Sequence, residues 1–319
     1  MPVSIFILLG VATAFGAADY PTKPITIVNP MAPGGNHDVV TRAFASVAEK
    51  YLGQSVVVVN KPGASGMIGI QSVVQAPPDG YTLLADGTLR VTVIEWEIVN
   101  GRTSPVTKDD LIPIGCYTMS PAVVVVPYNS KWKTLGDLIE DCKSKPGHYA
   151  FCSAGFYSAT HTAVEVFLRT IGIKARHVPY KGGGPCVSAL VGAHVDFSCQ
   201  LPTTCIPLSQ GNKLKILAVQ GDRRLKLIPE IPTVKELGID AEYYIWVGLT
   251  APRKTPRPIV EKLAEVTKKV SADEAFRRVI EKAGDEVRTL NSDELAKFCD
   301  KESQIHTKFY KQILQDEKK

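Results

Sequence analysis

The sequence of 319 residues lacks the features of several common protein classes. It contains no internal repeat with a period of about 20–50 residues and no low-complexity segment. The net charge of +5 comes from scattered Lys and Arg, without a basic stripe interleaved with aromatic residues, so we expect no nucleic-acid binding. Beyond residues 1–18, no apolar run approaches the roughly 20 residues that a membrane-spanning helix needs.

Metal motifs are missing as well. The cysteines form no CxxC pair and have no Cys/His spacing suited to zinc, so we predict no metal site and no cofactor. Their odd number leaves at least one thiol free or paired between molecules. We expect small buried side chains, with room for one disulfide whose partners the pattern does not identify, among Cys116, Cys142, Cys152, Cys186, Cys199, Cys205 and Cys299.

The composition is that of a globular protein with an export signal. Hydrophobic residues make up 45% of the chain and charged residues 22%, and the length suffices for two α/β domains. Residues 1–18 are apolar and end in Gly16-Ala-Ala18, which predicts a signal peptide cleaved before Asp19. A misassigned start or a buried N-terminal strand stays open, because no Lys or Arg precedes the apolar run. No Cys follows it, so we expect no lipid anchor.

The stretch 25–38 reads as strand, tight loop and helix. An apolar β-branched run ends at Pro30, the loop includes Ala32, Pro33, Gly34 and Gly35, and helical spacing resumes after Asp38. Free backbone N–H groups at such a helix start, with roughly half a positive charge from the dipole, suit a carboxylate or phosphate. We expect the glycines to use left-handed angles and to let the backbone approach a ligand. Asp38 either caps the helix or orients the ligand.

Two further strand ends repeat this arrangement. Residues 54–60 predict a fully buried strand of a parallel sheet, followed by a loop whose Ala64, Ser65 and Gly66 form a second anion-binding turn. Its glycines follow GxxGxxG, which is not the dinucleotide pattern GxGxxG. A third strand at 81–85 leads to Thr88. Parallel strands would bring all three ends to one crevice.

The second half of the chain contains similar loops. Strands at 122–127 and 149–152 flank a helix at 135–143, and a loop with free amides precedes a helix at about 160–170; its candidate ligand contacts are Ser153, Ala154, Gly155 and Ser158. Ser158 as a simple N-cap is the alternative. His161 is either packed or in contact with the ligand. A Ser/His hydrolase would need the GxSxG turn and an acidic partner, neither of which is evident.

A last loop, at 177–186, precedes another helix. It is not a P-loop, because the lysine comes before the glycines. Its candidates are Lys181, which either faces an anion or is solvated, together with Gly182 and Gly183. Asp196 is expected on the next strand. Further strands are predicted at 214–219 and 243–251, and helices at 259–271, 273–283 and 293–313.

Ordered short motifs across almost the whole mature chain resemble the receptors of the tripartite tricarboxylate transporter (TTT) family, also called TctC or Bug periplasmic solute-binding proteins. Examples are Ala32-Pro-Gly-Gly-Asn-His-Asp38, Asn60-Lys-Pro-Gly-Ala-Ser-Gly66 and Pro78-Asp-Gly-Tyr-Thr-Leu83. Other matching stretches are residues 20–25, 52–54, 153–161, 178–185, 190–196, 217–219, 223–224, 227–238, 246–249 and 251–256. This chain departs from the family in its many cysteines, in Phe156-Tyr157, and in an entry to the first loop, 29–32, without an aromatic residue.

The resemblance implies an α/β, two-lobed type II periplasmic binding protein fold, with open, mostly parallel sheets, helices on both faces and a two-segment hinge. It divides the chain into a signal peptide 1–18, lobe 1 at 19–121, lobe 2 at 122–244, and a return to lobe 1 at 245–319. The chain then crosses between lobes near Pro121 and near Trp246, where bending would close one lobe over the other.

The resemblance also implies a function. It predicts a non-enzymatic, monomeric periplasmic receptor that captures a small organic anion, such as a di- or tricarboxylate, an acidic amino acid or an aromatic carboxylate. The receptor would deliver this anion to the large and small membrane subunits of a TTT permease. A sensor that presents its loaded form to a signalling partner, and a hydrolase using Ser153 and His161, are the alternatives.

Overall fold

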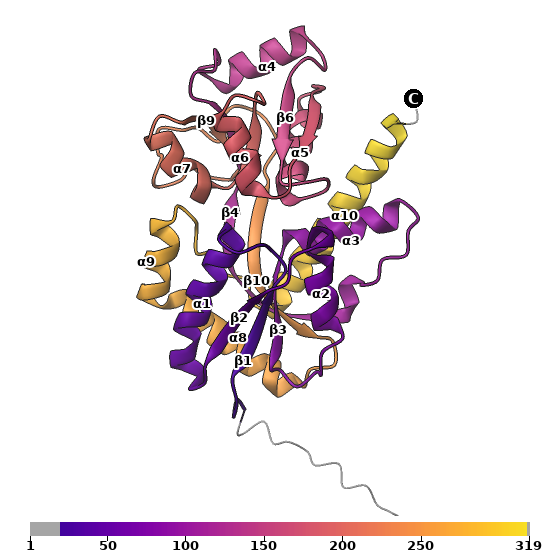
Figure 1. Cartoon of the computed structure of the whole chain (residues 1–319), viewed down its shortest axis with the longest axis vertical. Coiled ribbons are helices and arrows are strands. Elements are labelled where there is room, and N and C mark those ends of the chain that lie inside the picture. The colour runs from indigo at the N-terminus through magenta and orange to yellow at the C-terminus, as the bar shows by residue number, and fades with distance from the viewer. Residues whose placement is uncertain (1–19, 318–319) are drawn as a thin grey trace, which may run out of the picture.

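The computed structural model describes residues 20–317, and the predicted signal peptide lies outside them. The chain forms two lobes, one above the other in Figure 1. Lobe 1 contains the N-terminal strands and the C-terminal helices, and lobe 2 contains the middle of the chain. No helix within the described residues is long and apolar enough to cross a membrane.

Lobe 1 is built on a five-stranded sheet of order β2-β1-β3-β10-β4. Its strands are β1 (Ile25–Asn29), β2 (Val56–Asn60), β3 (Thr82–Gly87), β4 (Leu111–Pro121) and β10 (Tyr244–Pro252). Strand β1 runs parallel to β2 and β3, whereas β10 is antiparallel to both β3 and β4. The short 3₁₀ helices η2 (Ala64–Gly66) and η3 (Lys108–Asp110) precede α2 and β4.

Helices cover both faces of this sheet. They are α1 (Asn36–Leu52), α2 (Met67–Val74), α3 (Thr88–Val99), α8 (Arg257–Ala272), α9 (Glu274–Lys282) and α10 (Ser292–Glu317). In α1, Val40, Phe44, Ala48 and Leu52 recur every four residues and are buried with β1, which explains why this segment is an amphipathic helix. The helix ends at Gly53, whose φ of 67° is the left-handed conformation common after a helix.

One strand prediction is wrong in its burial. Residues 54–60 were expected to form a fully buried strand, but β2 lies at the edge of the sheet, and Val57 and Val59 are 48% and 37% exposed. A continuous apolar run does not distinguish a central strand from an edge strand with one uncovered face. The prediction also left residues 89–121 without elements, where the structure has α3 and β4.

Lobe 2 has shorter strands, and most of their pairs are antiparallel, unlike the mostly parallel sheets expected. Strands β8 (Ser198–Gln200), β5 (Val123–Pro127) and β9 (Leu214–Val219) pair antiparallel, and β6 (Ala150–Ser153) pairs parallel with β7 (Arg176–Pro179). A parallel bridge between Phe151 and Phe197 joins the two groups. The helices are α4 (Leu135–Ser144), α5 (Ala159–Thr170), α6 (Gly183–Val191) and α7 (Pro202–Gln210). Two apolar clusters fill the lobe, as expected for a sheet covered on both faces.

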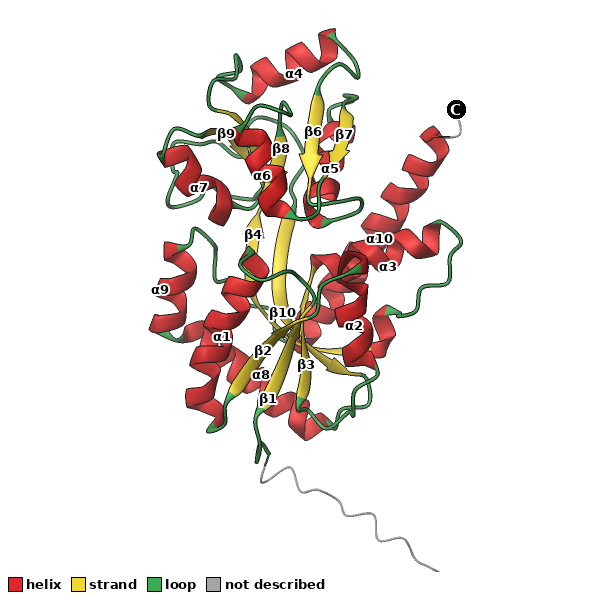
Figure 2. Cartoon of the chain, in the orientation of Figure 1, coloured by secondary structure: helices red, strands yellow, loops and turns green. Residues whose placement is uncertain are grey.

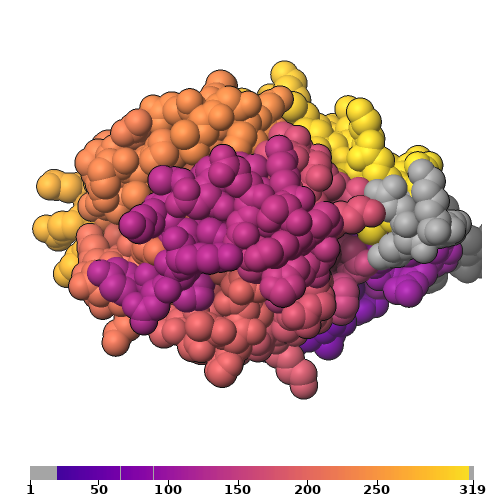
Figure 3. Space-filling view, turned by 90° about the horizontal axis from the view of Figure 1, so that it is seen from above, coloured from indigo at the N-terminus to yellow at the C-terminus, as the bar shows by residue number. Residues whose placement is uncertain are grey.

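Strands β4 and β10 run between the lobes (Figure 1), and Pro121 is paired with Tyr244 where they meet lobe 2. The N–H of Ala122 donates to the carbonyl of Tyr243 at 2.9 Å, so the two crossings lie side by side. This pairing supports the predicted lobe boundaries after residues 121 and 244, which stay predictions. From above, the C-terminal helix α10 emerges beside lobe 2 (Figure 3), where the Tyr310 and Thr162 hydroxyls lie 3.2 Å apart.

Candidate functional site

The predicted loops of the two lobes face each other. Figure 2 shows β6 and β7 pointing toward lobe 1, and α1 beginning on the side of lobe 1 that faces lobe 2. The loops that follow β1 and β2 therefore lie on the same side of lobe 1 as the start of α1, opposite the loop between β6 and α5.

Asp38 holds the first two loops of lobe 1 together. Its buried carboxylate accepts hydrogen bonds from the Gly34 N–H at 3.0 Å, from Asn60 Nδ2 at 2.8 Å and from Asn29 Nδ2 at 3.3 Å. Arg42 Nε completes the set at 3.0 Å. Burial alone would raise the pKa of Asp38, but these donors hold it at about 2. The carboxylate is thus ionised, with four donors around its two oxygens.

The prediction that Asp38 caps α1 is wrong. The N-cap is Gly35, which has no side chain, and Asp38 bonds to the N–H of Gly34 in the loop before it. The expectation of left-handed angles holds for Gly34, with φ of 78°, but is wrong for Gly35, with φ of −78°. A ligand contact by Asp38 stays a prediction. Sequence reasoning missed Asn29 and Asn60, although an Asn at the end of each strand was a readable signal.

The start of α1 offers free donors. Among residues 20–317, no protein acceptor is described for the backbone N–H groups of Gly35, Asn36 and His37, while Ala32, Pro33, Gly34 and Gly35 are exposed. The Oδ1 of Asn36 and the Nδ1 of His37 are buried without a described partner. Burial lowers the pKa of His37 to about 4, so the imidazole is neutral at pH 7. His37 was missed as a candidate although it stands beside Asp38.

The other lobe 1 candidates have structural roles, either in a turn or in a hydrogen bond with the backbone. Ala64, with φ of 45°, and Gly66, with φ of 87°, form the turn that starts α2, and Ser65 belongs to the same 3₁₀ helix η2. Thr88 is buried at the start of α3, and its Oγ1 accepts a hydrogen bond from the N–H of Trp246 at 3.0 Å. Its hydroxyl therefore anchors β10.

In lobe 2, the loop from 153 to 158 uses most of its own amides, which overturns the expectation that they are free. The Ala154 N–H donates to Thr160 Oγ1, and the Tyr157 N–H donates to His161 Nδ1. The N–H groups of Gly155 and Ser158 donate to Ser153 Oγ and to the Gly155 carbonyl, respectively. The alternative role of Ser158 is confirmed, since its Oγ caps α5 by accepting from the His161 N–H at 3.3 Å.

The hydrolase alternative requires Ser153 to pair with His161, and the structure does not show this pair. Ser153 Oγ lies 2.7 Å from Nε2 of His177, not of His161. Ser153 is fully buried, and the Nδ1 of His177 is buried with no described partner to orient it as a base. Burial lowers the pKa of His177 to about 4, and burial together with His177 lowers that of His161 to about 3. The two neutral rings stack with centroids 4.0 Å apart.

Of the remaining candidates, those of the loop before α6 lie beside the loop after β6, whereas Asp196 does not. The Gly182 N–H donates to the Ala154 carbonyl at 3.1 Å and joins the loop before α6 to the loop after β6. Lys181 and Gly183 stand on either side of Gly182 in the chain, and the Lys181 side chain is exposed. Asp196 is wrong as a strand residue: it lies in a bend before β8, and its carboxylate accepts from the Ala150 N–H at the start of β6, at the far end of that strand from Ser153.

A disulfide joins Cys152, at the end of β6, to Cys186, in α6. The other five cysteines are free and buried, which confirms the expectation of at least one unpaired thiol. Within residues 20–317, no three His, Cys, Asp or Glu side chains are grouped to hold a metal ion.

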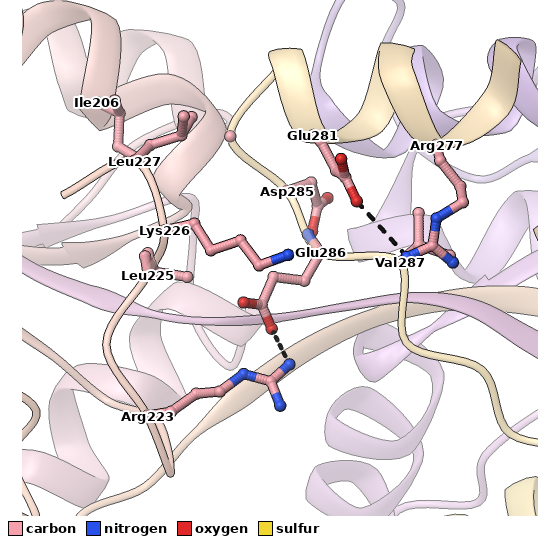
Figure 4. A pocket seen from close by; sticks show the side chains of 11 residues that line it. Ile206, Arg223, Leu225, Lys226, Leu227, Arg277, Glu281, Asp285, Glu286 and Val287 are labelled. Atoms are coloured by element: carbon pink, nitrogen blue, oxygen red, sulfur yellow. Dashed lines mark hydrogen bonds and ion pairs between the residues drawn. The ribbon is translucent and has the colours of Figure 1, made fainter. Parts of the chain in front are cut away.

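A cavity of about 200 Å³ lies between the lobes (Figure 4), and Asp285 in its lining accepts a hydrogen bond from Asn36 Nδ2, at the start of α1, at 3.2 Å. Arg223 and Lys226 enter it from lobe 2, and Arg277 and Glu286 from lobe 1. Arg223 forms an ion pair with Glu286 at 2.9 Å, which bridges the lobes. None of the predicted ligand contacts lines this cavity.

Known proteins match this chain over most of its length. The family model described as "Tripartite tricarboxylate transporter family receptor" matches residues 40–314. A Cupriavidus necator protein, described as "UPF0065 protein in gbd 5'region", is 34% identical over 288 residues, 89% of this chain and 85% of that protein.

Solved structures agree with the fold. MatC from Rhodopseudomonas palustris with bound malate superposes with a TM-score of 0.81 at 26% identity, over 91% of this chain and 100% of that one. A second R. palustris protein with adipate gives a TM-score of 0.83 at 25% identity, over 92% and 98%. The predicted two-lobed α/β fold is confirmed, and the matched proteins are solute-binding proteins, so the hydrolase alternative is wrong. The chain belongs to the tripartite tricarboxylate transporter receptor family.

Proposed function

We propose that this protein is an exported periplasmic receptor that binds a small carboxylate between its lobes. The observation that carries this proposal is the start of α1. Three consecutive N–H groups, those of Gly35, Asn36 and His37, have no described protein acceptor within residues 20–317, at the positive end of a 17-residue helix. The solved relatives with malate and adipate support the same ligand class.

The loops act as a preformed frame in this proposal. Asp38 and its donors fix the loop that presents the free N–H groups, so little backbone order is lost when the anion binds. The loops of lobe 2 close over the ligand by bending at the paired crossings, Pro121 and Tyr244. The loaded receptor then delivers the carboxylate to the large and small membrane subunits of a TTT permease.

A thermal-shift screen tests the binding step. Malate, adipate, citrate, glutamate and benzoate are added separately to the purified protein, with matched sodium chloride as the control for ionic strength. A true ligand at 100 times its Kd stabilises the folded state by about 2.7 kcal/mol and raises the melting temperature. If no carboxylate raises it, the proposed function is wrong. Co-purification of the loaded protein with the permease subunits tests the delivery step.

A further inference from the structure

Phe156 is the most exposed large apolar side chain among the candidate loops of lobe 2. It is 55% exposed on the loop between β6 and α5. Its ring meets the His177 ring edge-on, with centroids 4.9 Å apart and planes at 87°. An exposed aromatic side chain with one edge already packed presents a fixed apolar surface, because its rotamers are restricted before any ligand arrives.

Phe156 packs on a group of uncharged rings, of which Phe151 and His161 are buried. The His177 ring lies 4.8 Å from that of Phe151 and 4.0 Å from that of His161, with planes within 16° in both pairs. Both imidazoles are neutral at pH 7, since their pKa values are about 4 and 3. The Oε1 of Glu165 lies 3.9 Å from His161 Nε2, and its Oε2 lies 3.4 Å from Nε of Arg169, so the nearest charges form an ion pair. This half of the site does not attract a second anionic group.

Positive charge is scarce in the candidate loops of both lobes. Loops 30–38, 61–66, 153–158 and 180–184 contain only two lysines, Lys61 and Lys181, and no arginine, and both lysines are exposed. Arg42, in the second turn of α1, is already paired with Asp38. The donors at the start of α1 therefore suffice for one carboxylate, and a second would lose hydration without a partner that compensates for it.

We propose that the ligand is an aromatic monocarboxylate, whose carboxylate lies at the start of α1 and whose ring packs against Phe156. This inference rests on the proposed function and narrows its ligand class. Packing of the ligand ring on Phe156 buries apolar area of both rings as lobe 2 closes. Di- and tricarboxylates are disfavoured, because their remaining carboxylates would lie beside Phe156, where the candidate loops supply no cation other than the exposed Lys61 and Lys181.

Isothermal titration calorimetry with benzoate and phenylacetate, against malate and adipate, tests the ligand class. Phe156→Ala is expected to weaken binding of the aromatic acid by about tenfold, because it removes the ring that the ligand contacts. Phe156→Leu keeps apolar area without the ring and is expected to lie between Phe156→Ala and the wild type. Tyr128→Ala is the matched control, since Tyr128 is a 43% exposed aromatic residue at the far end of β5 and should change nothing.

The outcomes separate this inference from the proposed function. If malate or adipate binds and neither aromatic acid does, the inference is overturned while the carboxylate receptor stands. Equal affinity of the aromatic acid for Phe156→Ala and the wild type also overturns it. If no carboxylate binds at all, the proposed function fails together with the inference. Circular dichroism of each variant verifies that the fold is intact.

Discussion

The rings of Trp96 and Tyr157 stack with centroids 3.4 Å apart and planes at 16°. Trp96 belongs to α3 of lobe 1 and Tyr157 to the loop after β6 of lobe 2, so the stack bridges the lobes beside the candidate site. Tyr310 of α10 meets both rings edge-on, at 5.5 and 5.7 Å. Tyr157 also has a φ of 57°, a strained conformation for a residue with a Cβ.

This strain predicts an unusual order of stabilities. Tyr157→Ala and Tyr157→Gly both lose the stack, but only glycine relieves the left-handed backbone. We expect the glycine variant to be more stable by about 1 kcal/mol, measured by urea unfolding. The same pair at Phe156, which is not left-handed, should show the reverse order. An alanine variant at 157 that equals or exceeds the glycine variant would show that the loop is unstrained.

Gly35→Val isolates the backbone donors of α1. The φ of −78° is accessible to valine, and an added Cβ would lie 3.8 Å from the nearest atom, the Ala32 carbonyl oxygen, so the fold should survive. The branched side chain would project beside the free N–H groups. We expect a loss of carboxylate affinity of at least about tenfold, larger than that of Lys181→Ala, which removes one exposed, screened charge. Calorimetric titration of both variants measures the two losses of affinity. A larger loss for Lys181→Ala than for Gly35→Val would favour a charge-paired site.

Asp38→Asn should destabilise the protein. The amide NH₂ of asparagine would replace one carboxylate oxygen and face donors in either orientation. At the Oδ2 position it would face the Gly34 N–H and Arg42 Nε, and at the Oδ1 position it would face Nδ2 of Asn29 and of Asn60, so donors would lose their acceptor. The expected cost is about 2–4 kcal/mol in the free energy of unfolding. Arg42→Gln removes a half-exposed partner and should cost about 1 kcal/mol or less. Equal costs for the two variants would contradict the central position of Asp38.

The disulfide between Cys152 and Cys186 should account for two of the seven thiols. Titration under denaturing, non-reducing conditions is expected to find five. Replacing both cysteines by alanine should lower stability by about 3–4 kcal/mol, as estimated for a closed loop of 34 residues. Cys142→Ala, which removes a buried free thiol, is the control for lost packing. Seven titratable thiols would show that the bond does not form.

The stability contributed by the neutral, buried His161 and His177 should fall as the pH drops from 7 to 5. Burial lowers the pKa of His177 to about 4, and burial with the neighbouring ring lowers that of His161 to about 3, whereas unfolded histidine titrates near 6.5. The unfolded chain therefore binds more protons in this range, so the stabilisation is complete above about pH 6.5 and is lost as the pH falls toward the folded values. Urea midpoints should decrease accordingly. His161→Gln should show a shallower decrease, and an identical slope would refute the assignment.

Several elements were predictable because their signals are local. Proline and glycine end β1, and apolar residues at spacing four define α1, so the strand, loop and helix from 25 to 52 follow from neighbouring residues. The parallel arrangement of β1, β2 and β3 was likewise expected from successive strand–helix units. In residues 89–121, Gly101 and Pro105 do separate α3 from β4, but the apolar run before Gly101 was not assigned to a helix, nor the one after Asp110 to a strand, and both elements were missed.

The sequence by itself determined that the chain forms an α/β protein with glycine-rich loops at its strand ends, because turns and amphipathic periods depend on adjacent residues. Only the tertiary structure decided what those loops do. Asp38 binds donors from three other elements, and Ser153 pairs with His177 of β7 rather than with His161. Val57 and Val59 are exposed because β2 is an edge strand. Hydrogen-bond partners and burial depend on which segments meet in space, and that information is distributed over the whole chain.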